Sequence, residues 1–220
     1  MLLSMNVIEL FSSIDGEGKR QGFLTTFLRL HDCNIRCSYC DTLYSYGPES
    51  TFESMSVQAV ADVIEQLENH RITITGGEPL LQETAVIELI DELTRCNPGY
   101  DFNIETNGTI IPSFHRDNVW FTYDYKTPSS LAEDAMNLDI FKVATPADII
   151  KFVVGSMQDL DRMDEILKTY PTEAQVFVSP VWGNIEGATI VDYMKAHDWQ
   201  NVRFQLQIHK FIWDPDAKGV

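Results

Sequence analysis

The sequence predicts an α/β fold, an incomplete (β/α) barrel with a mostly parallel, curved sheet of about six strands. Short apolar and β-branched runs alternate with longer segments whose apolar residues recur at helical spacing, an order typical of βαβ units. The chain has 220 residues, and a complete eight-unit barrel usually needs ~250. We therefore expect a single domain over residues 1–220, with its site at the carboxyl ends of the strands.

The first half of the chain supplies two strands and two helices. TTFLRL (25–30) has the apolar and β-branched composition of a short strand. Residues 56–69 carry apolar side chains at the spacing of one helix face, and Ser56 can cap the start of that helix. RITIT (71–75) is a β-branched run that ends in Gly-Gly, which predicts a strand, and residues 83–96 repeat the helical spacing.

The second half continues the alternation. FNIE (102–105) and VWFTYDY (119–125) predict strands, and the irregular segment 126–146 is expected to hold a short helix or an inserted loop. Ser156 can cap the helix that follows the next strand. The remaining expected elements are a strand at 149–154, a helix at 156–170, a strand at 174–180, a helix at 188–197 and a strand at 202–207.

The composition is that of an ordinary globular protein, and its charge is strongly negative. Sixteen basic and 33 acidic side chains give a net charge of −17, which argues against a nucleic-acid partner because such proteins need a basic face. No run of ~18 apolar residues predicts a membrane span. The opening segment MLLSMNVIELFSS lacks the basic start of a secretory signal. We therefore expect a cytoplasmic protein that binds no membrane.

Three of the four cysteines, Cys33, Cys37 and Cys40, fall within the segment CNIRCSYC. Thiolates this close along one loop suit a soft metal or an iron–sulfur cluster. Three ligands leave one coordination position of a cluster open, as a reactive centre requires. The alternative is a structural zinc ion, which usually takes four protein ligands. Its fourth ligand would come from His31, Asp41 or Cys96, although Cys96, at the end of an expected helix, has the position of an ordinary, partly buried thiol.

Polar or glycine-containing segments follow five of the expected strands and should meet at one rim of the sheet. They are the cysteine loop and the segments 75–79, 105–108, 124–126 and 179–182. Gly76-Gly77 would let backbone groups approach a ligand, and Glu78 would offer a carboxylate to a ligand ammonium. Arg29 and Lys151 lie inside apolar strands, so each either pairs with an acid or faces a ligand.

The cysteine spacing, with Tyr39 before the last cysteine, resembles the signature of the radical SAM superfamily. Thr75-Gly76-Gly77-Glu78-Pro79 is similar to the glycine-rich motif of that superfamily. Within it, the chain resembles the 7-carboxy-7-deazaguanine synthase family over nearly its whole length. The segments that carry this likeness are SIDGEG (13–18), FLRL (27–30), CSYCDT (37–42), ETNG (105–108), KTPSS (126–130) and His209-Lys210.

The resemblance implies a carbon–nitrogen lyase of 7-deazapurine (queuosine) biosynthesis. A [4Fe–4S] cluster would cleave S-adenosylmethionine to a 5′-deoxyadenosyl radical, which takes hydrogen from C6 of 6-carboxy-5,6,7,8-tetrahydropterin. The ring would contract to 7-carboxy-7-deazaguanine with loss of ammonia and regeneration of the cofactor. The family also implies Mg²⁺, a flavodoxin- or ferredoxin-type reductant and a homodimer. A basic patch at Lys19-Arg20 could receive an acidic reductant.

The resemblance also assigns residues. Cys33, Cys37 and Cys40 would hold the cluster, Thr42 would bind Mg²⁺, Glu17 and Arg29 would act on the substrate, and Arg29 would meet its carboxylate. Asp15 stands where the family commonly has glutamine. The S-adenosylmethionine contacts would be Asp41, Gly76, Gly77, Glu78, Asp124, Tyr125, Lys126, Ser179, Pro180, Val181 and Trp182. The substrate contacts would be Ile14, Asp15, Gly16, Glu17, Arg29, Thr75, His209 and Val220.

Two other functions compete with this interpretation. One is another radical SAM enzyme, such as a glycyl-radical activating enzyme, which shares the cysteine spacing but would not explain SIDGEG, Arg29 or the tail. The other is a zinc-stabilised α/β binding module with structural cysteines.

Overall fold

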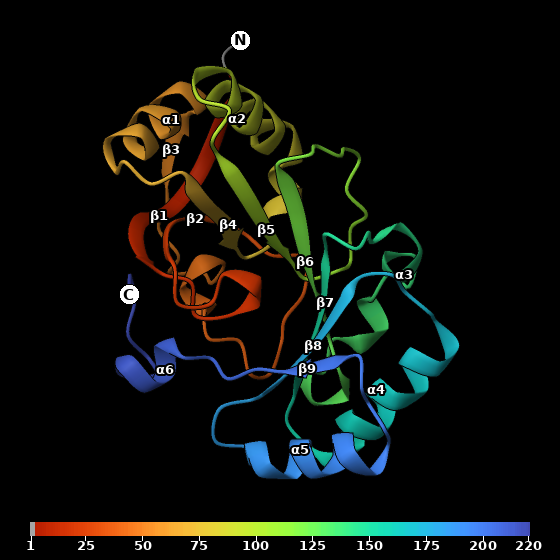
Figure 1. Cartoon of the computed structure of the whole chain (residues 1–220). Helices are drawn as coiled ribbons and strands as arrows, with labels where there is room; N and C mark the ends of the chain where they lie inside the picture. The colour runs from red at the N-terminus through yellow and green to blue at the C-terminus, as the bar shows by residue number, and fades with distance from the viewer. Residues whose placement is uncertain (1–2) are drawn as a thin grey trace.

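The computed structural model describes residues 3–220, and within them a single sheet holds nine strands in the order β3-β1-β2-β4-β5-β6-β7-β8-β9. Seven neighbouring strands, from β2 to β9, run parallel. The outermost strands, β3 and β9, do not pair with each other, so the sheet is open (Figure 1). The predicted α/β class with a mostly parallel, unclosed sheet is confirmed, whereas the number of strands is nine and not about six.

The parallel strands correspond to the runs expected from the sequence. Their bounds are β2 Leu24–Leu30, β4 Arg71–Gly76, β5 Asp101–Thr106, β6 Val119–Tyr125, β7 Ile149–Val154, β8 Gln175–Pro180 and β9 Val202–Phe204. β9 is shorter than the expected 202–207. Beyond Phe204, the side-chain amide of Gln205 accepts the N–H of Gly18 at 2.7 Å and donates to its C=O at 2.9 Å.

The two antiparallel strands, β1 (Ser4–Ile14) and β3 (Glu53–Ser56), were not predicted. β1 pairs with β2 on one side and β3 on the other. An irregularity in its register between Val7 and Glu9 interrupts the alternation by which a strand is recognised in a sequence.

The helices that lie between β3 and β9 in the chain cover the outer face of the sheet (Figure 1). Ser56 and Ser156 cap α1 and α4 as expected, because their hydroxyls accept the N–H groups of Ala59 and Asp159. The irregular segment 126–146 contains the short helix α3, which is the first of the two alternatives expected for it. The α-helices are α1 Val57–Gln66, α2 Glu83–Cys96, α3 Ile140–Val143, α4 Met157–Thr169, α5 Gly187–Ala196 and α6 His209–Ile212. The 3₁₀ turns are η1 Gly18–Arg20, η2 Leu43–Ser45, η3 Pro79–Gln82, η4 Pro128–Ser130 and η5 Glu133–Ala135.

The apolar core lies between the sheet and these helices, where side chains such as Ile64, Ile74 and Leu89 are fully buried. The other face of the sheet carries polar side chains such as Arg29, Thr75 and Asp124. It is partly covered by loops and by the C-terminal segment with α6 (Figure 1). None of the helices within residues 3–220 is long and apolar enough to cross a membrane.

Candidate active site

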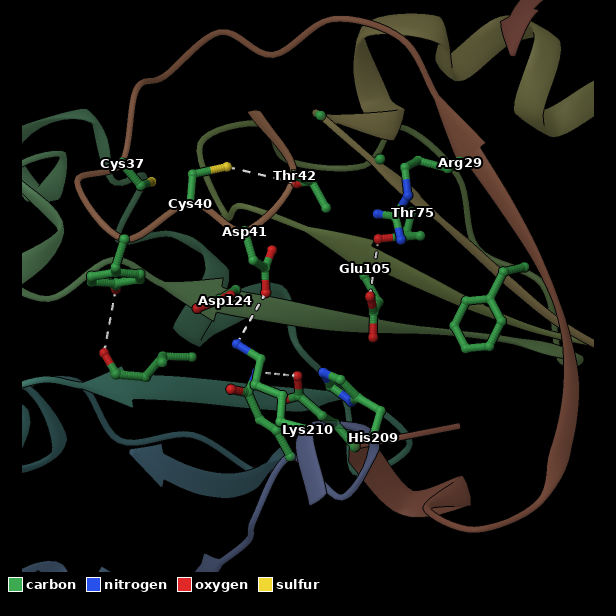
Figure 2. A pocket seen from close by; sticks show the side chains of 18 of the residues that line it. Arg29, Cys37, Cys40, Asp41, Thr42, Thr75, Glu105, Asp124, His209 and Lys210 are labelled. Atoms are coloured by element: carbon green, nitrogen blue, oxygen red, sulfur yellow. Dashed lines mark hydrogen bonds and ion pairs between the residues drawn. The ribbon is translucent and has the colours of Figure 1, made fainter. Parts of the chain in front are cut away.

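A cavity of about 270 Å³ opens on the inner face of the sheet, at the carboxyl ends of the parallel strands. Its walls come from the loop after β1, the cysteine loop after β2, the ends of β4 to β7 and the tail around α6. In Figure 2, Cys37 and Cys40 lie at one side of the view and Arg29 at the other. The strand-end segments expected to meet at one rim therefore do meet, and the C-terminal tail joins them.

The three cysteines of the loop all line this cavity as free thiols. Cys33 is buried, and Cys37 and Cys40 are half-buried. The loop is tied to the segment after β6, because Ser38 donates its N–H to the carbonyl of Ser130 at 2.9 Å. The thiols thus face one space from one anchored loop.

Gly76 and Gly77 pack directly against the start of the cysteine loop. Gly76 has φ of +140°, and a Cβ on it would lie 2.2 Å from the Leu30 carbonyl oxygen. A Cβ on Gly77 would lie 1.8 Å from the carbonyl oxygen of Asp32 and 2.9 Å from Cβ of Cys33. Only glycine fits both positions, and the close approach sets where the first cysteine stands relative to β4.

Glu78 turns away from the cavity. Its carboxylate is fully buried and accepts hydrogen bonds from Leu80 N, Thr106 Oγ1 and Asn107 N at 2.7–3.0 Å. It therefore connects the glycine-rich turn to the end of β5. The free carboxylate beside the exposed Gly-Gly backbone, expected from the sequence, is not found there.

Four charged side chains form the floor of the cavity. Lys151 Nζ lies 3.0 Å from Glu17 and 3.7 Å from Asp124, and Lys126 Nζ lies 3.0 Å from the same Asp124 oxygen. Burial opposes ionisation of Glu17, but the Lys151 ammonium and the Gln207 amide outweigh it and hold the pKa of Glu17 below its usual value. Lys151 was expected either to pair with an acid or to face a ligand. It pairs with two acids, and it also lines the cavity.

Asp124 keeps one acceptor free. Its Oδ1 is buried and has no hydrogen-bond partner among the described residues, while the side chain lines the cavity. A buried carboxylate oxygen without a donor is costly unless a ligand supplies one. Asp124 is therefore suited to accept a hydrogen bond from a bound ligand.

Glu105 is a site residue that the sequence did not single out individually. It lies at the end of β5, where Thr75 Oγ1 donates to its carboxylate at 3.0 Å (Figure 2). Burial raises its pKa to about 7, and the nearby negative charges of Glu17 and Asp15 add to this, although Lys151 opposes it. The sequence feature that could have identified Glu105 is its position at the start of the ETNG segment, at the end of a strand.

Asp15 is held by the protein itself. Its Oδ2 lies 3.2 Å from Arg20 Nε, 3.3 Å from Thr73 Oγ1 and 3.4 Å from Thr25 Oγ1. Arg20 is buried and also donates to the Ile72 carbonyl. The basic surface patch expected at Lys19-Arg20 is therefore not found, because Arg20 is buried and its charge is paired with Asp15.

The C-terminal tail rests on the loop after β1. Ile208 donates its N–H to the Gly16 carbonyl at 3.1 Å, and a Cβ on Gly16 would lie 2.0 Å from His209 Nδ1. Lys210 Nζ approaches Asp41 at 3.4 Å (Figure 2). Val220 also lines the cavity, so the chain end folds back over it.

The remaining expected site residues divide into two groups. Thr42, whose hydroxyl lies 3.6 Å from Cys40 Sγ, lines the cavity together with Ile14, Val181 and Trp182. Four expected contacts do not line it: Glu78, Tyr125, Ser179 and Pro180. Tyr125 is buried with its hydroxyl donating to Glu133, and the Ser179 hydroxyl is buried without a partner among the described residues.

Comparisons with known proteins identify the superfamily of this chain. The family model described as "Radical SAM superfamily" matches residues 29–151. The chain belongs to the radical SAM superfamily.

Named relatives place this radical SAM chain more narrowly. A 7-carboxy-7-deazaguanine synthase of Clostridium acetobutylicum is 37% identical, over 99% of this chain and 100% of the relative. Another of Methanospirillum hungatei is also 37% identical, over 96% of this chain and 86% of the relative. The chain belongs to this enzyme family. The crystal structure of QueE from Escherichia coli shares the fold with a TM-score of 0.70 at 22% identity, covering 92% of this chain and 93% of that one.

The radical SAM family implies a [4Fe–4S] cluster and S-adenosylmethionine, and the residues fit both. Three free thiols on one loop face the cavity, as iron–sulfur ligation by cysteine requires. Beside them lie the exposed backbone of Gly77 and the unpartnered Asp124 oxygen. Over residues 3–220, no three His, Cys, Asp or Glu side chains are gathered closely enough to hold a single metal ion.

Proposed function

We propose that this chain converts 6-carboxy-5,6,7,8-tetrahydropterin to 7-carboxy-7-deazaguanine with loss of ammonia. The family membership supports this reaction, and the charge distribution of the cavity supports the substrate. Arg29 offers a cation at one side, while Glu17 and Glu105 offer acceptors elsewhere on the wall. A pterin with one carboxylate and several ring N–H donors is complementary to this arrangement.

Bound cluster and S-adenosylmethionine supply the radical chemistry, and the protein supplies binding and orientation. Arg29 binds the substrate carboxylate, and Glu17, fixed by Lys151, accepts N–H donors of the pterin. The backbone of Ile14, Asp15 and Gly16 borders the ring, with Thr75 and His209 as further contacts. The tail that ends at Val220 covers the cavity and limits the access of water.

The cofactor contacts are proposed for side chains or backbone that border the thiols. Cys33, Cys37 and Cys40 ligate the cluster. Asp41, Gly76, Gly77, Asp124, Lys126, Val181 and Trp182 border the space left for S-adenosylmethionine. A contact through Glu78, Tyr125, Ser179 or Pro180 would require backbone atoms or a local rearrangement.

We also propose a metal site, an oligomeric state and location, and a type of electron donor. Thr42 would bind Mg²⁺ together with the substrate carboxylate, since Mg²⁺ needs few protein ligands and retains waters. The enzyme would be a cytoplasmic homodimer, as the family suggests. Its electron donor would be of the flavodoxin or ferredoxin type, received without a basic patch at Arg20.

One anaerobic assay tests the proposal. Protein reconstituted with iron and sulfide is mixed with dithionite, S-adenosylmethionine, Mg²⁺ and 6-carboxytetrahydropterin, and the products are identified by mass spectrometry. We expect 7-carboxy-7-deazaguanine to form only with S-adenosylmethionine, which is not consumed stoichiometrically. Release of 5′-deoxyadenosine without this product would reject the substrate and favour another radical SAM reaction. A colourless protein that takes up zinc and no iron would favour the binding module.

A further inference from the structure

The register between β1 and β2 places Glu9 beside Arg29. Val7 pairs with Leu30, and the next pair is Glu9 with Arg29, so Ile8 is an extra residue in β1. Without this bulge, Ile8 would stand opposite Arg29. Bulges near active sites commonly re-aim a side chain, and here the bulge replaces an apolar neighbour of Arg29 with a carboxylate.

The contacts made by Glu9 occupy one edge of the guanidinium. Glu9 Oε1 lies 2.6 Å from Arg29 Nε, and the Tyr44 hydroxyl donates to the same oxygen at 2.8 Å. The side chains of Arg29 and Glu9 are only 15% and 21% exposed, so solvent screens this ion pair weakly. Arg29 is therefore held at its Nε edge by a carboxylate that is itself fixed by Tyr44.

The other edge of Arg29 stays available. Arg29 and Tyr44 line the cavity, whereas Glu9 does not, so the Glu9 carboxylate contacts the guanidinium without forming part of the cavity wall. In the described part of the chain, the Arg29 side chain donates a hydrogen bond to protein through Nε, and Nη1 and Nη2 donate none. Those two nitrogens form the end-on edge that can bind a carboxylate through two parallel hydrogen bonds.

We propose that Glu9 is a positioning residue, which holds the Nε edge of Arg29 so that the Nη1/Nη2 edge faces the substrate carboxylate. This inference rests on the proposed function, in which Arg29 binds that carboxylate. An unrestrained arginine loses rotamer entropy when it binds a ligand, and fixing it before the substrate arrives lowers the cost of binding. Glu9 does not compete with the substrate, because it contacts Nε alone and does not line the cavity.

The test measures the Kd of 6-carboxytetrahydropterin for anaerobic holoenzyme that carries S-adenosylmethionine. We expect Glu9→Ala to weaken binding about 10-fold, which is about 1.4 kcal/mol, because the Arg29 side chain must then be ordered when the substrate binds. Glu9→Gln should stay within about 3-fold of the wild type, because its amide oxygen still accepts from Arg29 and Tyr44. Iron content and the Kd of S-adenosylmethionine should not change. If Glu9→Ala fails to fold, Glu9→Met replaces it, with similar volume and no carboxylate.

Two controls separate positioning from a general structural effect. In an Arg29→Met background, Glu9→Ala should weaken binding no further, as expected when one residue acts through the other. A tetrahydropterin without the 6-carboxylate should bind the wild type and Glu9→Ala equally. Unchanged or tighter binding of the carboxylated pterin by Glu9→Ala would overturn the proposal, as would equal weakening for both pterins. Failure of the wild type to bind the carboxylated pterin would instead reject the proposed substrate, and this inference with it.

Discussion

The Lys151 ammonium lies 3.0 Å from the Glu17 carboxylate, and this buried ion pair joins strand β7 to the loop after β1. Lys151 also faces Asp124 at 3.7 Å, so one cation serves two carboxylates on the cavity floor. The side chain comes from inside the apolar run IIKFVV, where every residue is buried. The lysine therefore holds the loop after β1, where we propose that the substrate is recognised, and the end of β6, where we propose a contact to the cofactor.

Lys151→Met should destabilise the protein strongly. It leaves the Glu17 carboxylate buried without its cation, and breaking a buried pair in this way costs about 3–5 kcal/mol. At roughly 2–4 °C per kcal/mol, the apparent melting temperature of the anaerobically reconstituted protein should fall by about 6–20 °C. Lys142→Met is the matched control, because Lys142 pairs with Asp139 in an exposed position on α3. Equal melting temperatures for the two variants would contradict the role of Lys151.

Glu105 should make stability depend on pH in a definite direction. Burial raises its pKa from 4.5 to about 7 in the folded state, so the folded protein binds this proton more tightly than the unfolded chain does. The resulting stabilisation is fully present below about pH 4.5 and is lost as pH rises through about 7. Glu105→Gln removes this loss, so its melting temperature should rise relative to the wild type between pH 5 and pH 8. A difference that stays constant over this range would show that Glu105 does not titrate there.

Arg20→Met tests whether the buried ion pair between Arg20 and Asp15 stabilises the protein. The substitution leaves the Asp15 carboxylate buried with only the hydroxyls of Thr25 and Thr73 as donors, and we expect a loss of about 3 kcal/mol. The double variant Asp15→Gln/Arg20→Met should be more stable than Arg20→Met alone, because it leaves no unpaired charge buried. The effects of the two substitutions on stability are therefore not additive. Thermal melting measures both, and a double variant less stable than the single one would argue against the pair.

The parallel strands and the meeting of their carboxyl ends could be predicted from the sequence. Runs such as RITIT and IIKFVV are buried on both faces, so composition alone identifies them. Once the strands are parallel, the segments that follow them must lie at the same edge of the sheet. The cysteine loop, Gly76-Gly77 and Asp124 therefore reach one cavity for topological reasons.

The features that could not be predicted from the sequence depend on contacts between distant segments. Strand β1 was not predicted because its bulge at Ile8 breaks the alternation of apolar and polar residues. Glu78 follows a strand like the other site residues, but Thr106 and Asn107, almost thirty residues later, draw its carboxylate away from the cavity. Nothing in the spacing of the chain indicates that Glu9 rather than Ile8 lies opposite Arg29. These details are set by tertiary pairing, which local patterns do not encode.

Cys37→Ala should lower iron binding without unfolding the apoprotein. Cys37 lines the cavity on the anchored loop, and loss of one of three ligands removes the basis for holding a cluster. Cys96→Ser is the control, since Cys96 is exposed at the end of α2. Iron per chain after anaerobic reconstitution should fall to near background for Cys37→Ala and remain at the wild-type level for Cys96→Ser. Full iron content in Cys37→Ala would exclude it as a ligand.

Gly77→Ala should displace the cysteine loop. The added Cβ would lie 1.8 Å from the Asp32 carbonyl oxygen, a backbone atom that cannot move without shifting Cys33 as well. Overpacking of this kind costs about 1–3 kcal/mol or more, so both the melting temperature and the affinity for S-adenosylmethionine should fall. Gly155→Ala is the control, because its Cβ would meet no atom closer than 3.4 Å. If Gly77→Ala matched Gly155→Ala in both measurements, the glycine would not be fixing the distance between β4 and the cysteine loop.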